Sequence, residues 1–232
     1  MKELFSFLKD LSANNNREWF QANRARYDAA REKLDEMARL FILAVEQHDP
    51  GAARLTPKDC TYRIYRDVRF SPDKSPYKTH MGIFVNPLGG KKGIECGYYL
   101  GLEPGRTVFA CGTYCLPSPV LRAVRQSIFD LTDEYLGIVE DPEFKRIFPT
   151  VGADPLKTAP KGFPKDWPHI DLIKPREFVA MTSLPDSFFY DEKGHPGSGP
   201  AEAGRRLAPY IAQAKRLNDF LNFTILEYSS LR

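Results

Sequence analysis

The chain has 232 residues, which favours one elaborated domain that can bury a large core without disulfides or metals. Its composition, 42% hydrophobic and 27% charged residues, is that of an ordinary soluble globular protein. A net charge of +3 is too small to indicate bulk nucleic-acid binding, no apolar run is long enough to predict a membrane span, and the N-terminal stretch lacks the pattern of a signal peptide.

The first 50 residues are predicted to be helical. An apolar stripe predicts a short helix over residues 2–11. A longer helix is expected to begin at Asn15, which we interpret as its cap, with Glu18 completing a capping box. The Pro50-Gly51 pair ends that helix near residue 48.

Between residues 61 and 116 the apolar residues alternate, which predicts strands. The expected strands cover residues 61–70, 81–85, 94–103 and 107–116, and their short connections predict antiparallel pairing. One face of the third strand is rich in glycine, including Gly97 and Gly101. Either another element packs closely on that face, or its backbone is open to a ligand.

The last half of the chain is predicted to be mostly helix and loop. The expected elements are helices at 117–140 and 141–148, a loop at 150–168, a helical turn at 169–174, a strand at 177–182, a turn-rich segment at 191–200 and a final helix at 201–226. Pro209 should kink the final helix or mark its true first turn.

These elements predict an α+β fold in which helices pack over an antiparallel sheet of about five or six strands. We expect residues 1–232 to form a single domain, with a helical part at 1–50, a sheet part at 58–116 and a helix and loop part at 117–232.

The four cysteines show no metal-binding or redox pattern. Their spacings match no common zinc site, and no CxxC is present. We interpret Cys60, Cys96, Cys111 and Cys115 as reduced thiols, chiefly buried, in a cytoplasmic protein. No histidine and carboxylate pair has metal-ligand spacing, so no metal and no cofactor are expected.

The excess of positive charge lies in residues 58–80. This segment holds six basic and three acidic residues, so its net charge equals the +3 of the whole chain. The predicted anion-binding residues are Arg63, Arg66, Arg69, Lys74, Tyr77, Lys78 and His80. Arginine can donate two parallel hydrogen bonds to an oxyanion, and lysine adds a point charge. The structural alternative is an ion-pair network that joins these cations to Asp28, Glu32 or Glu36 of the long helix.

Alternation along the expected strand gives these residues different roles. Arg63 and Arg69 share one face, whereas Arg66 lies on the apolar face, where a guanidinium requires a carboxylate, backbone carbonyls or a bound anion. We therefore predict ligand contact for Arg63 and Arg69, and a structural role for Arg66. Asp67 and His80 are the candidate catalytic residues; Asp67 should be ionised, and His80 is a general base if it opens into a cleft.

Several motifs resemble a widespread bacterial and fungal family of uncharacterised proteins, a domain of unknown function. They are residues 14–20 (NNNREWF), 63–71 (RIYRDVRFS), 73–80 (DKSPYKTH) and 97–105 (GYYLGLEPG). The similarity covers nearly the whole chain, and its central motif is specific. The resemblance implies a soluble single-domain protein and supplies no catalytic residues to carry over.

Three classes of function stay open. The first is a domain that binds an anionic small molecule, either phosphorylated or not, at the basic residues, with enzymatic activity left undecided. The second is a nucleic-acid-binding module in which Tyr65, Tyr77 and Tyr99 stack on bases, although the balanced charge outside the basic segment weighs against it. The third is an architectural role for the motif, with a partner surface near the 150–168 loop.

Overall fold

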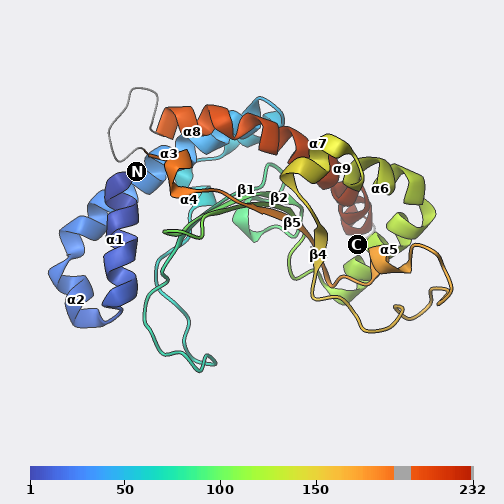
Figure 1. The fold of residues 1–232 in the computed structure, drawn as a ribbon, viewed down its shortest axis with the longest axis horizontal. Helices are drawn as coiled ribbons and strands as arrows, with labels where there is room; N and C mark the ends of the chain where they lie inside the picture. The colour runs from blue at the N-terminus through green and yellow to red at the C-terminus, as the bar shows by residue number, and fades with distance from the viewer. Residues whose placement is uncertain (191–199, 231–232) are drawn as a thin grey trace.

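A five-stranded antiparallel sheet forms the centre of the molecule in the computed structural model, which describes residues 1–190 and 200–230. The strand order is β1-β2-β3-β5-β4. The strands are β1 (Met81–Val85), β2 (Gly97–Leu102), β3 (Val108–Gly112), β4 (Val151–Ala153) and β5 (Glu177–Ser183). Helices cover one face of this sheet (Figure 1), which confirms the predicted α+β class.

The helices come from both ends of the chain and from the segment after β3. They are α1 (Lys2–Ala13), α2 (Arg17–Ala22), α3 (Arg24–Glu46), α4 (Pro57–Cys60), α5 (Ser118–Asp130), α6 (Thr132–Val139), α7 (Pro142–Ile147), α8 (Pro200–Arg206) and α9 (Ala208–Ser230). Short 3-10 turns are η1 (Pro50–Arg54), η2 (Gly90–Lys92), η3 (Ile170–Ile173) and η4 (Asp186–Phe188). The long helices α3 and α9 pack on the sheet, where Tyr98, Leu100 and Leu102 of β2 are buried.

The N-terminal region differs from the prediction at one cap. The cap of α2 is Asn16, whose side chain accepts a hydrogen bond of 2.9 Å from the Trp19 N–H. Asn15 does not cap the helix, because its amide is committed elsewhere: it donates to the Tyr77 carbonyl at 2.9 Å and accepts from the Tyr77 N–H at 3.1 Å. The helix is also interrupted at Asn23, so α2 and α3 replace the single long helix.

The predicted strand over residues 61–70 is wrong. Residues 61–80 form an irregular arm that extends away from the sheet (Figure 1), with isolated bridges from Thr61 to Ile83 and from Tyr65 to Tyr77. Pro76 has no N–H for a ladder, and polar side chains in the arm bond to nearby backbone instead. We call residues 61–80 the basic arm.

The rest of the chain follows the prediction with three differences. The expected helix at 117–140 is divided at Leu131 into α5 and α6, and β4 lies inside the expected 150–168 loop. The final helix is divided at Leu207, with Pro209 in the first turn of α9, which confirms one of the two alternatives for that proline. Of the expected turn at 191–200, residues 191–199 lie outside the described residues.

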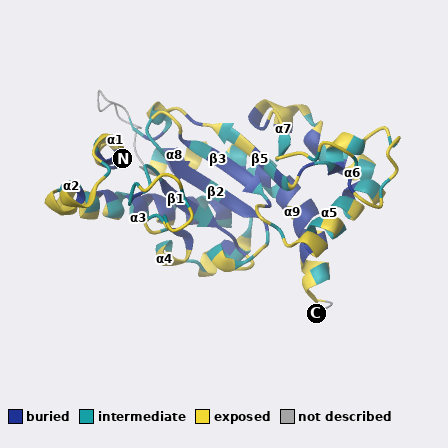
Figure 2. Cartoon of the chain, turned by 90° about the horizontal axis from the view of Figure 1, so that it is seen from below, coloured by how far each residue is buried: buried dark blue, intermediate teal, exposed yellow. Residues whose placement is uncertain are grey.

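The second face of the sheet carries no helix (Figures 1 and 2). Alternation and strand pairing place on it Gly82 and Phe84 of β1; Gly97, Tyr99 and Gly101 of β2; Val108, Ala110 and Gly112 of β3; and Glu177, Val179, Met181 and Ser183 of β5. We call this surface the open face. The basic arm joins the sheet beside the outer edge of β1, through the bridge from Thr61 to Ile83.

Candidate functional site

The base of the basic arm is fixed by an aromatic contact and a buried aliphatic side chain. The Tyr77 ring stacks on Phe20 with 4.0 Å between ring centroids, and only 3% of Tyr77 is exposed. Ile64 is buried as well, and Asn15 holds the Tyr77 backbone on both sides. Tyr77, one of the predicted anion-binding residues, therefore lies in the core and anchors the arm.

Arg66 has both a carboxylate and a carbonyl partner, two of the kinds of partner that the sequence left open. It forms an ion pair with Asp73, and it donates to the Ser75 carbonyl at 3.3 Å and to the Ser71 hydroxyl at 3.2 Å. Hydrogen bonds from Ser75, together with that from Arg66, lower the pKa of Asp73 to about 2. The guanidinium of Arg66 is thus part of the structure of the arm.

Arg69 and Lys74 also bond within the arm. The Arg69 guanidinium donates to both oxygens of Asp67, at 3.0 and 2.7 Å, and the Lys74 ammonium donates to the Val68 carbonyl at 3.0 Å. The hydrogen bonds from Arg69 lower the pKa of Asp67, so this carboxylate is ionised, as expected.

The acidic residues of α3 do not pair with the arm. Asp28 pairs with Arg24 and Glu36 with Lys33, and within the described residues neither these two nor Glu32 forms an ion pair with an arm cation. In the contact between helix and arm, the helix supplies the cation and the arm the acceptor: Arg31 of α3 donates to the Tyr62 carbonyl at 3.2 Å. The ion-pair network considered as the structural alternative is therefore not present in this part of the chain.

Arg63 and Lys78 differ from the other cations of the arm. The Lys78 ammonium lies 5.6 Å from the centroid of the Tyr62 ring, and the side chain is half-buried. Burial, and then the positive charge of Arg63, lower the pKa of Lys78. Over residues 1–190 and 200–230 neither cation has an ion-pair partner. We call Tyr62, Arg63, Lys78 and His80 the cationic edge.

His80 completes the cationic edge next to β1. It lies directly before β1, where the charges of Glu103 and Lys78 act on it. Burial lowers the pKa of His80, and the nearby Glu103 only partly opposes this effect, so the imidazole is neutral at neutral pH. Glu103 accepts hydrogen bonds from the Thr79 hydroxyl at 2.8 Å and from Arg106 at 2.7 Å.

The glycines of the open face make room for aromatic rings. A Cβ atom on Gly82 would lie 2.9 Å from the Tyr99 hydroxyl oxygen, and one on Gly101 would lie 2.9 Å from Cε1 of the same ring. A Cβ on Gly97 would come within 2.8 Å of the Phe84 ring. The glycines therefore make room for side chains of the sheet itself, and not for another element, as the first explanation expected.

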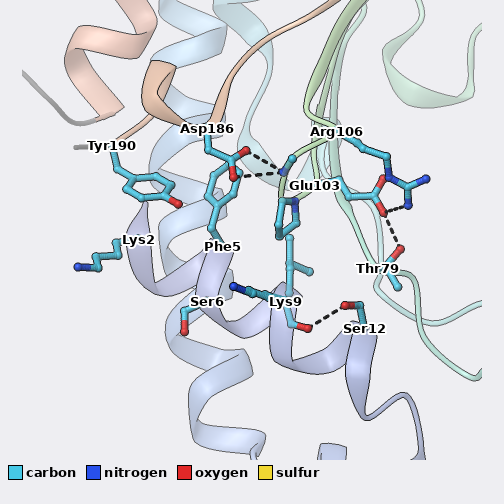
Figure 3. Close-up of a pocket in the computed structure, with 13 residues that line it drawn as sticks. Lys2, Phe5, Ser6, Lys9, Ser12, Thr79, Glu103, Arg106, Asp186 and Tyr190 are labelled. Atoms are coloured by element: carbon cyan, nitrogen blue, oxygen red, sulfur yellow. Dashed lines mark hydrogen bonds and ion pairs between the residues drawn. The ribbon is translucent and has the colours of Figure 1, made fainter. Parts of the chain in front are cut away.

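A hollow of about 610 Å³ lies on the other side of Glu103, between α1 and the β2–β3 turn (Figure 3). Its acidic groups are engaged, because Asp186 accepts hydrogen bonds from the Gly105 N–H at 3.0 and 3.2 Å and Glu103 is held by Thr79 and Arg106. Lys2 and Lys9 of α1 supply its other charges. Sequence analysis missed this hollow because its walls come from distant segments without a local motif.

The cysteines are free thiols in two settings. Cys60, Cys96 and Cys111 are buried, and burial raises the pKa of Cys60 to about 12. Cys115 is exposed. In the described part of the chain, no cluster of three or more histidine, cysteine and acidic side chains could hold a metal ion.

No helix among the described residues is both long and apolar enough to cross a membrane.

Comparisons with known proteins identify a family. No curated protein and no solved structure matches the chain. The model of a family described as conserved hypothetical protein (DUF2461) matches residues 3–200. Because that match covers most of the sequence, the chain belongs to the DUF2461 family of conserved hypothetical proteins.

Proposed function

We propose that this protein binds an anionic small molecule, in particular one with a phosphate group, at the cationic edge. The proposal is carried by the proximity of two like charges, Arg63 and the half-buried Lys78. In the described residues neither has a carboxylate partner. Two neighbouring cations disfavour each other, and this cost grows when one of them loses water. A bound oxyanion would relieve the repulsion and accept hydrogen bonds from both.

The proposal uses three of the predicted anion-binding residues. Arg63, Lys78 and His80 form the ligand set. Arg66, Arg69 and Lys74 already donate to groups of the arm, and Tyr77 is buried. We place the protein in the cytoplasm as part of this proposal, because its cysteines are free thiols.

Nucleic-acid binding is less well supported. The buried Tyr77 cannot stack on a base, and Tyr65 packs against it with 5.4 Å between ring centroids. The two arm cations without an ion-pair partner in the described residues would contact few phosphates, whereas nucleic-acid-binding surfaces usually contact many. A small ligand therefore fits the available charge better than a polynucleotide does.

Thermal unfolding with inorganic phosphate tests the proposal. Phosphate at a hundredfold excess over its Kd should stabilise the wild type by about 2.7 kcal/mol. Lys78→Met, which keeps the apolar stem, and Arg63→Gln should lose most of this stabilisation. Lys74→Met is the matched control, because its ammonium already donates to the Val68 carbonyl in the same arm.

The result that contradicts the proposal is equally direct. If phosphate and sulfate leave the wild type unchanged, or if Lys78→Met responds as strongly as Lys74→Met, the cationic edge is not an anion site. Binding of a single-stranded oligonucleotide should also be measured as a function of salt. If the logarithm of its binding constant falls with the logarithm of the salt concentration as steeply as for a protein with six to ten phosphate contacts, the nucleic-acid alternative is favoured instead.

A further inference from the structure

Over β1, β2 and β3 the open face lacks the charged side chains that a water-facing sheet surface usually carries, and its polar residues Glu177 and Ser183 lie on β5. An antiparallel sheet with one solvated face normally alternates apolar residues inside with polar residues outside. Here the open-face positions of β1, β2 and β3 are glycine, alanine, valine, phenylalanine and tyrosine, without a charged residue. On β5, Met181 is 52% exposed. This composition suits a surface that is covered by a flat, apolar group.

Tyr99 is the largest side chain on this surface and leans over the backbone. Its ring lies above the paired glycines Gly82 and Gly101, with Cε2 3.0 Å from the place of one missing Cβ and Cε1 2.9 Å from the other. A ring held in this way turns one face to the sheet and the other away from it. Tyr99 is half-buried, so part of its side chain is accessible to a ligand.

The cationic edge adjoins this ring. The Tyr62 N–H donates to the Gly82 carbonyl at 3.3 Å, which places Tyr62 beside one of the two glycines that Tyr99 covers. The Lys78 ammonium lies over the Tyr62 ring, at 5.6 Å from its centroid. Tyr62 and Glu103 also contribute to the raised pKa of Tyr99, behind the larger effect of burial. An aromatic surface and an uncompensated positive charge are therefore neighbours.

We infer that Tyr99 is a stacking surface for a planar aromatic group whose phosphate is held by Lys78 and Arg63. The ligand class is a small aromatic phosphate ester, and a nucleoside monophosphate is its simplest probe. This inference rests on the proposed anion site and adds the second half of the ligand. A tyrosine ring stacks well on a flat π-system, and the glycines beneath the ring leave no side chain to push the ligand away from it.

Calorimetric titration with two phosphates tests the inference. Adenosine monophosphate and glycerol phosphate share a phosphate monoester, but only the first has an aromatic group. We expect the wild type to bind the nucleotide about tenfold more tightly, since stacking on an aromatic side chain gives roughly a five- to 150-fold gain. Tyr99→Leu should remove this difference and leave glycerol phosphate binding unchanged, whereas Tyr99→Phe should keep it. Tyr114→Leu, at an exposed tyrosine beyond β3, is the matched control.

The outcomes separate the inference from the proposed function. If Lys78→Met abolishes binding of both phosphates but the wild type does not distinguish them, the stacking role of Tyr99 is wrong and the anion site stands. If neither phosphate binds the wild type, both are wrong. If a single-stranded oligonucleotide binds far more tightly than the mononucleotide, with a steep salt dependence, the small-molecule ligand is wrong.

A second measurement serves if Tyr99→Leu does not fold. Saturation transferred from the wild-type protein should reach the adenine ring protons in the nucleotide complex, and those protons should shift upfield in the ring current of Tyr99. Adenine protons that receive no more saturation than the distant solvent-exposed ribose protons would overturn the inference without any variant.

Discussion

Arg66 and Lys78 show how two cations of one arm take different roles. Arg66 is surrounded by a carboxylate, a carbonyl and a hydroxyl, and its side chain is 24% exposed. Lys78 has an aromatic ring and another cation beside it. The charge of Arg66 is therefore used by the fold, and the charge of Lys78 is left for a ligand.

We expect Arg66→Ala to lower the unfolding midpoint more than Arg63→Ala does. The first change removes three hydrogen bonds that brace the arm, and the second removes none within the described residues. The loss should stay well below that of a broken buried pair, because Asp73 is 60% exposed and becomes hydrated. Urea unfolding of both variants measures the difference, and equal midpoints would contradict a bracing role for Arg66.

His80 should make anion binding depend on pH. Its pKa in the folded protein lies below the ordinary value of 6.5, so the ring gains a proton only in acid. A third positive charge at the cationic edge should then tighten sulfate binding by about fivefold, the effect of a charge pair worth about 1 kcal/mol in water. Sulfate titrations at pH 7.5 and 5 measure the change; an equal gain in His80→Gln would show that another group is responsible.

The lowered pKa of His80 has the opposite effect on the stability of the protein without an anion: acid lowers the free energy of unfolding. A lowered pKa means that the unfolded chain takes up the proton first as pH falls through 6.5. The neutral His80 therefore contributes stability above that pH, and the contribution is lost in acid. Sulfate should offset this loss in the wild type.

At the scale of elements, α9 is attached to the sheet by hydrogen bonds as well as by apolar packing. Asn218 accepts from the Gly112 N–H at 2.9 Å and donates to the Gly97 carbonyl at 3.0 Å. Asn222, one turn later, accepts from the Cys96 N–H at 2.7 Å and donates to its carbonyl at 3.3 Å. Both asparagines are buried, and they satisfy backbone groups where β2 begins and β3 ends.

Asn218→Leu should destabilise the protein by about 2–4 kcal/mol, because it leaves a half-buried N–H and a buried carbonyl without partners. Leucine has a similar size, so the effect reports the hydrogen bonds and not a cavity. Asn14→Leu, at an exposed asparagine at the end of α1, should have little effect. Urea unfolding measures both, and a fall in the free energy of unfolding of less than 0.5 kcal/mol for Asn218→Leu, roughly that of a surface change, would contradict this account.

Periodicity predicted the elements whose apolar residues face a continuous core. It placed β1, β5 and α1 closely, because each buries one regular stripe, and the Asp141-Pro142 start signal placed α7. It predicted a strand at 61–70 because apolar and polar residues alternate around Ile64. In the structure Ile64 is buried only at the base of the basic arm, and no strand forms there. It missed β4, which has three residues. The asparagines of α9 were also missed, since a polar residue on a buried stripe gives no sign of its partner.

The candidate site was predictable in place but not in detail. Charge and aromatic composition located the basic arm. Which cations remain free depends on short-range pairs such as Arg69 with Asp67, and on the position of Tyr99 on another strand. Neither is visible in an alternating pattern, because both depend on how the backbone turns between the residues.

At the scale of the molecule, all parts of the chain contribute to one core. The N-terminal α3 and the C-terminal α9 pack on the same sheet, and β4 and β5 enter that sheet from the last third of the sequence. This arrangement leaves the opposite face open and brings the basic arm beside its β1 edge (Figure 2). The fold therefore presents a helix-covered side that holds the structure together and a bare side with a cationic border.

A structure of the complex with adenosine monophosphate would locate both halves of the ligand. We expect the phosphate within hydrogen-bond distance of the Lys78 ammonium and the Arg63 guanidinium, and the adenine ring against Tyr99. A phosphate held by Lys2 and Lys9 in the hollow beside α1, or by Arg69 and Lys74 near the tip of the arm, would contradict this expectation.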